Sequence, residues 1–381
     1  MRVLVAFDKF KNALSARAAG ETAAQALRTK HPDWTIELCP LTDGGDGFTE
    51  TLTQAAGGQL EAVEVSGPDG RLATAGLGLV DLDRIRPDAR TRLLAGHRAF
   101  AAGSTLAIVD LASASGLALL APEDRDPWST TTRGTGELLA AAGRRASAIV
   151  LGVGGSATND LGCGALAALG LRFLDAFGTV LQPASPRQWA DVARLEGRVT
   201  LPPLVIACDV TNPLLGPRGA TATFGPQKGL AAADVRRLDA LAGKMAASLC
   251  DHFGRPQSVG EIPGSGAAGG VAFGLLAAAD ATLVPGFDFV SAWLDLPAKL
   301  AAADLVITGE GRFDATSLGG KAPGALAALA RRRGKPVHVF AGSLGLPADR
   351  AHHAITPEGM PLDEALGRTG ELLAAAIARI L

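Results

Sequence analysis

The sequence contains no hydrophobic run of the roughly 18 residues that a membrane-spanning helix requires. Its richest apolar stretch, from Leu117 to Pro122, is far shorter. The apolar run at the N-terminus is about half as long as a signal-peptide core and ends at the charged Asp8. We therefore expect a protein that has no membrane partner and resides in the cytoplasm.

Cysteine is scarce as well. The four cysteines form neither a C-x-x-C pair nor a cluster with histidine, so we expect no zinc site and no disulfide framework. The formal net charge is -2, without a basic patch or an acidic tail in the sequence, which argues against a nucleic-acid partner. At 381 residues the chain exceeds the roughly 250–300 that one core supports, so we expect two domains.

Several common catalytic motifs are also missing. The sequence has no G-x-x-x-x-G-K-[ST] phosphate loop, no protein-kinase motif set and no G-x-S-x-G nucleophile turn. None of the six histidines lies in a Ser/His/Asp pattern, and His352 and His353 are predicted to be solvated. Any kinase activity of this chain therefore needs a different phosphate-binding loop.

Strands alternate with helices at both ends of the chain. The N-terminal part predicts a strand over Arg2–Phe7, a helix from the N-cap Ser15 to about Lys30, and a strand over Thr35–Cys39. The C-terminal part predicts strand, helix, strand and helix in turn, over Leu305–Thr308, Ala322–Arg333, Val337–Ala341 and Pro361–Leu381. This alternation is typical of an α/β fold, and we predict that both ends contribute to one parallel sheet.

The middle of the chain is less regular, with long stretches such as Leu82–Ala102 and Asp175–Pro203 that have no clear periodicity. We predict a discontinuous first domain, residues 1–66 plus 286–381, into which a second α/β domain, residues 67–285, is inserted. These boundaries rest on Gly67-Pro68 and Pro285-Gly286.

A glycine loop, Gly152–Asp160, lies between the predicted strand Ala148–Leu151 and the predicted helix Leu161–Leu169. Backbone N–H groups in such a loop can bind phosphate, and Gly154 and Gly155 allow close approach. Three neutral donors and one acid follow in the loop: Ser156, Thr158, Asn159 and Asp160. Asp160 could reach a metal ion. The alternative is an ordinary tight turn between a strand and a helix.

A second glycine run, Gly264–Gly270, matches G-x-G-x-x-G. A dinucleotide-binding fingerprint must follow a strand and be followed by an acid about 20 residues later, and neither condition is met here. We therefore predict a loop at the start of a helix rather than a dehydrogenase site.

Acidic residues follow several of the predicted strands. They are Asp8, Asp43, Asp46, Asp209, Glu310 and Asp314. In open α/β sheets this edge binds the ligand, and carboxylates together with phosphates hold Mg²⁺. A solvated loop would explain any one of these acids, but several at one edge favour a site.

Lysine is rare, yet Lys11, Lys228 and Lys321 lie in or near loops, the latter two beside glycines. Each could be an ordinary surface lysine. Together they favour a polyanionic ligand, because phosphoryl transfer requires cations on the phosphates.

Several sequence blocks resemble the bacterial type I glycerate kinase family, in order and over nearly the whole chain. The blocks are Ala6–Lys11, Leu14–Ala16, Pro40–Gly47, Thr130–Leu138, Gly152–Asp160, Cys208–Pro217, Phe224–Gly229, Gly264–Gly270 and Thr308–Asp314. The family's typical P-D-S-F-K-G-S is F-D-K-F-K-N-A here, and Asp46 replaces the glutamate of its D-G-G-E-G. Asp8, Lys11 and Asp43 are retained, so we expect activity.

The resemblance implies two α/β domains, one of them flavodoxin-like, with the active site in the cleft between them. It implies MgATP and D-glycerate as substrates and 2-phosphoglycerate as the usual product. Gly154, Gly155, Ser156, Thr158, Asn159 and Glu310 are the candidates for binding the nucleotide, and Asp46 and Asp160 for binding the metal. The catalytic candidates are Asp8, Asp43 and Asp209 as base or orienting acid, Lys11 and Lys228 as phosphate or carboxylate cations, and Arg312 as a carboxylate clamp. The alternatives are a kinase of another small hydroxy or sugar acid and a non-catalytic ligand-binding regulator on the same fold.

Overall fold

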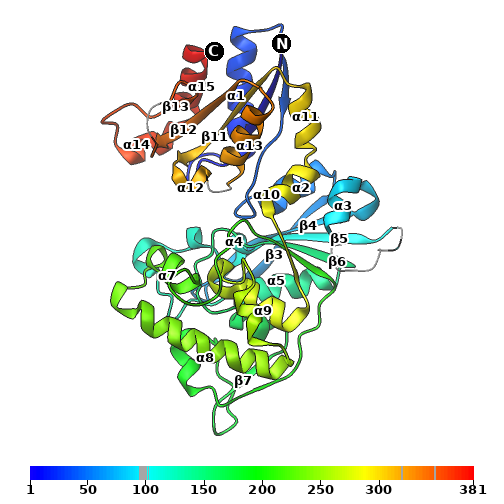
Figure 1. Ribbon diagram of the computed structural model, residues 1–381, viewed down its shortest axis with the longest axis vertical. Coiled ribbons are helices and arrows are strands. Elements are labelled where there is room, and N and C mark those ends of the chain that lie inside the picture. Colours follow the sequence, from blue (N-terminus) through cyan, green and yellow to red (C-terminus); the bar gives the residue numbers. More distant parts are fainter. Residues whose placement is uncertain (94–100, 102, 319–320, 347–348) are drawn as a thin grey trace. The chain divides into compact units, whose positions relative to one another are not determined.

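The computed structural model describes residues 1–93, 101, 103–318, 321–346 and 349–381 (Figure 1). The chain divides into two compact units. Unit 1 consists of Met1–Asp43 and Phe287–Leu381, and unit 2 consists of Gly44–Gly286. Each unit has its own sheet covered by helices, which confirms the predicted α/β class.

The first crossing between the units lies at Asp43–Gly44 and not near Gly67, where the sequence placed it. The reason is the pairing of β3 (Gln59–Ser66), which is antiparallel to β4 (Leu72–Asp81) along its whole length. This hairpin ties β3 to unit 2. The second crossing, after Gly286, lies one residue from the predicted boundary.

The sheet of unit 1 has five parallel strands in the order β13-β12-β11-β1-β2. The strands are β1 (Arg2–Phe7), β2 (Thr35–Leu38), β11 (Leu305–Phe313), β12 (Val337–Leu344) and β13 (His352–Ala354). When the strands are numbered along the chain, this is the order 2-1-3-4-5 of flavodoxin-like folds. The prediction that one domain is flavodoxin-like is therefore confirmed. The strand order reverses between β1 and β11, and ligands bind outside the carboxyl ends of strands at such a point.

The helices of unit 1 are α1 (Ala16–Lys30), α10 (Gly286–Trp293), α11 (Leu296–Ala302), α12 (Ala315–Leu318), α13 (Ala322–Arg332), α14 (Leu362–Gly367) and α15 (Thr369–Ile380). Helix α1 begins where predicted, because Ser15 Oγ accepts a hydrogen bond from Ala18 N at 3.1 Å. The C-terminal helix, which was predicted as a single helix, is broken at Arg368, where φ is -109°.

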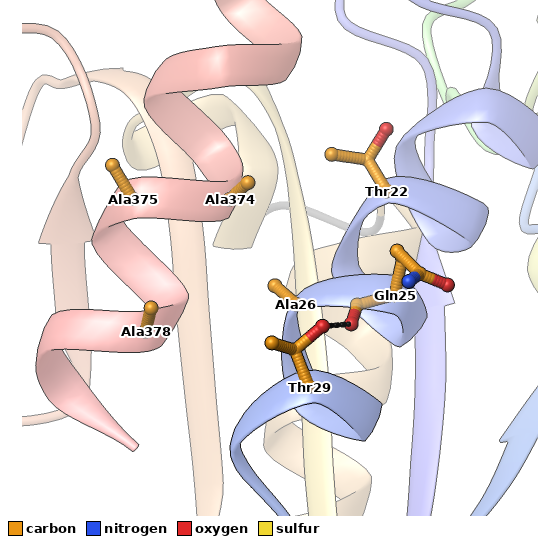
Figure 2. A pocket seen from close by; sticks show the side chains of 7 residues that line it. All are labelled: Thr22, Gln25, Ala26, Thr29, Ala374, Ala375 and Ala378. Atoms are coloured by element: carbon orange, nitrogen blue, oxygen red, sulfur yellow. Dashed lines mark hydrogen bonds between the residues drawn. The ribbon is translucent and has the colours of Figure 1, made fainter.

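A groove between α1 and α15 is lined by Thr22, Gln25, Ala26, Thr29, Ala374, Ala375 and Ala378 (Figure 2).

Unit 2 has a six-stranded mixed sheet in the order β10-β9-β6-β5-β4-β3 and a small hairpin of β7 and β8. Its further strands are β5 (Thr105–Asp110), β6 (Ala148–Gly152), β7 (Arg172–Leu174), β8 (Arg194–Glu196), β9 (Leu204–Ala207) and β10 (Thr282–Val284). Its helices are α2 (Phe48–Ala55), α3 (Pro87–Leu93), α4 (Leu111–Ser115), α5 (Arg133–Gly143), α6 (Cys163–Ala168), α7 (Ala220–Phe224), α8 (Val235–Phe253) and α9 (Ala267–Ala279). Strands β6 and β9 are buried along their whole length and form the centre of this core.

Two stretches of unit 2 were predicted to be irregular. Within Leu82–Ala102 the structure shows the short helix α3, and residues 94–100 and 102 lie outside the described part of the chain. Within Asp175–Pro203 it shows β8 and a short 3-10 helix, Pro186–Asp191. Among the described residues, no helix is long and apolar enough to cross a membrane.

His338 and His353 form a pair on one face of β12 and β13, with His338 Nδ1 2.8 Å from His353 Nε2. The prediction of solvated histidines is wrong for His353 and its neighbour His352, because both are partly buried in the sheet. Burial, followed by the charge of His338, lowers the pKa of His353 to about 4 from the ordinary value of 6.5. Burial also lowers the pKa of His338 and of His352.

This shift predicts acid destabilisation of unit 1. The folded state holds His353 neutral, so the unfolded chain takes up a proton first, and stability is lost as the pH falls from about 6.5 to about 4. Thermal unfolding of the His353→Gln variant should therefore depend less on pH over this window than that of the wild type. His252→Gln, on α8 of unit 2, is the control and should behave like the wild type. Equal pH dependence of His353→Gln and wild type would contradict the prediction.

Candidate functional site

Two acidic side chains lie next to each other where the strand order of unit 1 reverses. Asp8 directly follows β1, and its N–H donates to Gly309 O of β11 at 3.0 Å. Glu310 is the next residue of β11. Asp8 is 4% exposed and Glu310 is 6% exposed. The carboxyl ends of β1 and β11 therefore present two buried carboxyl groups side by side.

The electrostatics of this edge are unusual. Burial, followed by repulsion from Asp43, raises the pKa of Asp8 to about 7, although the N–H of Lys9 donates to Asp8 Oδ1 at 2.7 Å. Burial also raises the pKa of Glu310, against the influence of Ser317 and of Lys321, whose Nζ lies 3.9 Å from Oε2. The structure thus brings together Asp8, Asp43 and Glu310 from three separate parts of the sequence.

Two threonines that the sequence did not single out belong to the same region. Thr308 precedes Glu310 by two residues on β11, and Thr42 precedes Asp43; both are almost completely buried. Among the described residues, neither Thr308 Oγ1, Thr42 Oγ1 nor Glu310 Oε1 has a hydrogen-bond partner. Threonine is common in strands, so Leu305–Thr308 gave no signal that Thr308 carries a polar group into this region.

Besides Lys321, unit 1 contains two further predicted cations, Lys11 and Arg312. Lys11 is exposed in a tight loop closed by the hydrogen bond from Leu14 N to Phe10 O at 2.9 Å. Its backbone lies beside β11, since a Cβ on Gly311 would come within 3.2 Å of Lys11 N. The Arg312 side chain is 72% exposed, and its Nε lies 3.1 Å from Asp314 Oδ2.

In unit 2 the glycine loop Gly152–Asp160 follows β6, as predicted from the sequence. Gly154 N donates to Gly44 O at 3.0 Å, and a Cβ on Gly154 would lie 2.8 Å from the Cα of Gly45. Only glycine permits this approach. Gly155 has a φ of 74°, which favours glycine, and it is the exposed residue of the loop.

Lys228 holds this loop from the inside. It is 1% exposed, and its Nζ donates to Ser156 Oγ at 2.7 Å and to Thr158 O at 2.6 Å. Burial lowers the pKa of Lys228 to about 7, although the charge of Asp160 acts in the opposite direction. The side chain of Lys228 is therefore directed into the loop and not into solvent.

Asp160 is surrounded by donors. Its carboxylate accepts hydrogen bonds from Thr132 N and Oγ1, both at 2.8 Å, and from Gly162 N and Gly164 N, both at 3.1 Å. Because these groups lie at the starts of α5 and α6, the contacts favour a structural role for Asp160 over the predicted metal ligation. Burial raises the pKa of Asp160, although these hydrogen bonds act in the opposite direction.

Asp46, the other predicted metal ligand, is half-buried in the turn before α2. In the described part of the chain, no group of three or more His, Cys, Asp or Glu side chains is arranged to hold a metal ion.

The remaining residues of the loop are buried in unit 2. Asn159 Nδ2 donates to Thr221 Oγ1 at 3.0 Å, whereas Thr158 Oγ1 and Asn159 Oδ1 have no partner among the described residues.

Asp209 follows β9 and is half-buried beside Gly286, where a Cβ would lie 2.8 Å from Asp209 Oδ2.

The second glycine run begins α9, which confirms the prediction of a loop at the start of a helix. Ala268, Gly269 and Gly270 all have positive φ, and Gly269 O accepts from Leu161 N at 3.0 Å. This contact fixes the end of the loop Gly152–Asp160.

Comparison with known proteins extends these observations. The model of the glycerate kinase family matches residues 3–381. The chain is 36% identical over 385 residues to the glycerate kinase of Bacillus subtilis (strain 168), with 98% of this chain and 95% of the relative covered. It is 37% identical over 349 residues to the glycerate 2-kinase of Escherichia coli (strain K12), with 90% and 86% covered.

A solved structure agrees. The crystal structure of a protein assigned as glycerate kinase 2 from Salmonella typhimurium LT2 matches with a TM-score of 0.76 and 35% identity, covering 100% of this chain and 97% of that chain. Sequence and fold therefore agree along nearly the whole length, and the chain belongs to the glycerate kinase family.

Proposed function

We propose that this protein is an ATP-dependent glycerate kinase of the bacterial type I branch. It transfers the γ-phosphoryl group of MgATP to a hydroxyl of D-glycerate and releases 2-phosphoglycerate. The observation that carries the proposal is the pair of buried acids, Asp8 and Glu310, where the strand order reverses in a member of this family. A buried carboxylate beside further acids suits an alcohol, which must give up a proton when it attacks phosphorus.

Asp8 is the acid best suited to receive that proton. It is more buried than Asp43 and Asp209, and its pKa of about 7 lies near the working pH, where a base is most effective. As the acceptor oxygen bonds to the γ-phosphorus, its proton passes to the Asp8 carboxylate. The bond between that phosphorus and the ADP oxygen breaks, and ADP leaves. Lys11 and Arg312 are proposed to bind the glycerate carboxylate.

The glycine loop of unit 2 fits the triphosphate. Gly155 is exposed, Gly154 leaves no side chain at the turn, and Thr158 Oγ1, a hydroxyl that can donate, lacks a partner among the described residues. Lys228 and Ser156 hold the loop in shape through their hydrogen bond. When bound, Mg²⁺ would neutralise phosphate charge. It prefers phosphate and water oxygens with one or two carboxylates, so Asp46 is the proposed protein ligand and Asp160 is not.

The test measures ADP formation with a coupled enzyme assay. We expect ADP release that requires D-glycerate and stops when Mg²⁺ is chelated. Glycolate, D-lactate and tartronate serve as competing acceptors, and a higher kcat/KM for one of them would replace glycerate as the proposed substrate. ADP release at the same rate without any acceptor would contradict the proposal.

A further inference from the structure

Three buried side-chain oxygens of unit 1 lack a hydrogen-bond partner within the part of the chain that the structure describes. They are Thr42 Oγ1, Thr308 Oγ1 and Glu310 Oε1, in residues that are 1%, 0% and 6% exposed. Folded proteins satisfy nearly all buried polar groups, because leaving one without a partner is costly. Three such atoms in neighbouring segments therefore need an explanation.

The sheet register places these atoms around Asp8. Thr308 pairs with Ala6, and the ladder continues past β1 because Asp8 N donates to Gly309 O. Alternate residues of a strand share a face, so Thr308 and Glu310 lie on the same face as Asp8. On the other side of β1, Leu41 N donates to Phe7 O at 2.8 Å, which brings Thr42 to the same end of the strand.

The chemistry of these groups defines the ligand. A carboxylate only accepts hydrogen bonds, whereas a threonine hydroxyl can donate and accept. The partner must therefore carry donors, and an alcohol hydroxyl is both donor and acceptor. Nucleotide phosphates carry no donors and would be repelled by Asp8, Asp43 and Glu310. Contact between Glu310 and the phosphates of the nucleotide is therefore unfavourable.

We propose that Thr308 and Glu310 form a hydroxyl-binding subsite for the acceptor, holding the hydroxyl of D-glycerate that is not phosphorylated while the other lies at Asp8. The inference rests on the proposed function and adds to it the residues that select a substrate with two hydroxyl groups. Such a subsite discriminates against an analogue that lacks one hydroxyl, because its own polar groups then lose their partners.

The test uses Thr308→Val, which replaces the hydroxyl by a methyl group, and Glu310→Gln. We expect each to raise the KM for D-glycerate about tenfold and to leave the KM for ATP unchanged. The inhibition constants of D-lactate and 3-hydroxypropanoate, which each lack one hydroxyl, supply the second readout. In Thr308→Val, one of these analogues should bind about as well as D-glycerate, because the lost contact no longer favours the natural substrate.

Two further variants keep the outcome clear. Thr308→Ser retains the hydroxyl and should restore the wild-type KM, including in the case that Thr308→Val fails to fold. Thr35→Val, at the exposed first residue of β2, is the matched control and should be without effect. Variants that raise the KM for ATP, or that change neither constant, would overturn the subsite. A wild-type protein that forms no ADP with D-glycerate would instead overturn the proposed function, so the two failures are distinguishable.

Discussion

Asp8→Asn is expected to lower kcat/KM with D-glycerate about a thousandfold, close to 4 kcal/mol of transition-state stabilisation. Asparagine keeps the shape of the side chain and can still accept a hydrogen bond from Lys9 N, but it cannot take a proton. Asp8 lies against β11 with little exposure, and the neutral amide leaves this buried position without the proposed base. The measurement is steady-state kinetics, with Asp33→Asn on the exposed surface as control.

The pH dependence separates a base from a structural residue. The pKa of Asp8 is raised to about 7, so in the wild type kcat/KM should rise with pH through about 7, and this limb should be absent in Asp8→Asn. The stability of the folded state depends on pH in the opposite direction to kcat/KM. A raised pKa means that the folded state favours the protonated acid, so the wild type loses stability as the pH rises from about 4 to about 7. Asp8→Asn should thus be at least as stable as the wild type at neutral pH. A variant that is inactive because it has unfolded would contradict this account.

Lys228→Met should have the second largest effect and, unlike Asp8→Asn, should act on stability as well. Methionine fills most of the same space but leaves Ser156 Oγ and Thr158 O without the Nζ donor at 2.7 and 2.6 Å. Loss of these two buried hydrogen bonds is expected to cost about 2 to 3 kcal/mol in the free energy of unfolding. Because the loop is then no longer held in shape, kcat/KM for ATP should fall about a hundredfold.

Lys244→Met, on the exposed face of α8, is the matched control and should change neither the unfolding free energy nor the kinetics. The result that would count against the proposed role of the loop is a selective rise in the KM for D-glycerate. If Lys228→Met changed neither the unfolding free energy nor kcat/KM, the contacts of Lys228 would contribute nothing to the loop.

Local sequence signals were sufficient for several elements of unit 1, but not for α10, α11 and α12 or for the break between α14 and α15. Ser15 as an N-cap and the alanine and leucine positions after it predicted α1, and apolar runs predicted β1 and β2, because these signals depend on neighbouring residues only. The unit boundary could not be predicted in the same way. Gln59–Ser66 forms a strand in either case, and only its pairing with β4 assigns it to unit 2.

The roles of individual polar residues depend even more on distant parts of the chain. Asp160 follows a glycine loop and so indicated a metal ligand, but Thr132, far away in sequence, supplies two of its four donors. Thr308 is an ordinary strand residue in sequence and becomes notable only because its buried oxygen lacks a partner among the described residues. Strand-end acids were the better guide, since the parallel sheet of unit 1 brings Asp8 and Glu310 to one edge.

Transfer of the phosphoryl group to D-glycerate can be followed with γ-labelled ATP. The protein is incubated with labelled ATP, Mg²⁺ and D-glycerate, and the label is followed into products by chromatography and phosphorus NMR. We expect one labelled phosphoglycerate for each ADP released, with the phosphate on the C2 oxygen. Label that appears as inorganic phosphate while D-glycerate stays unmodified would contradict the account.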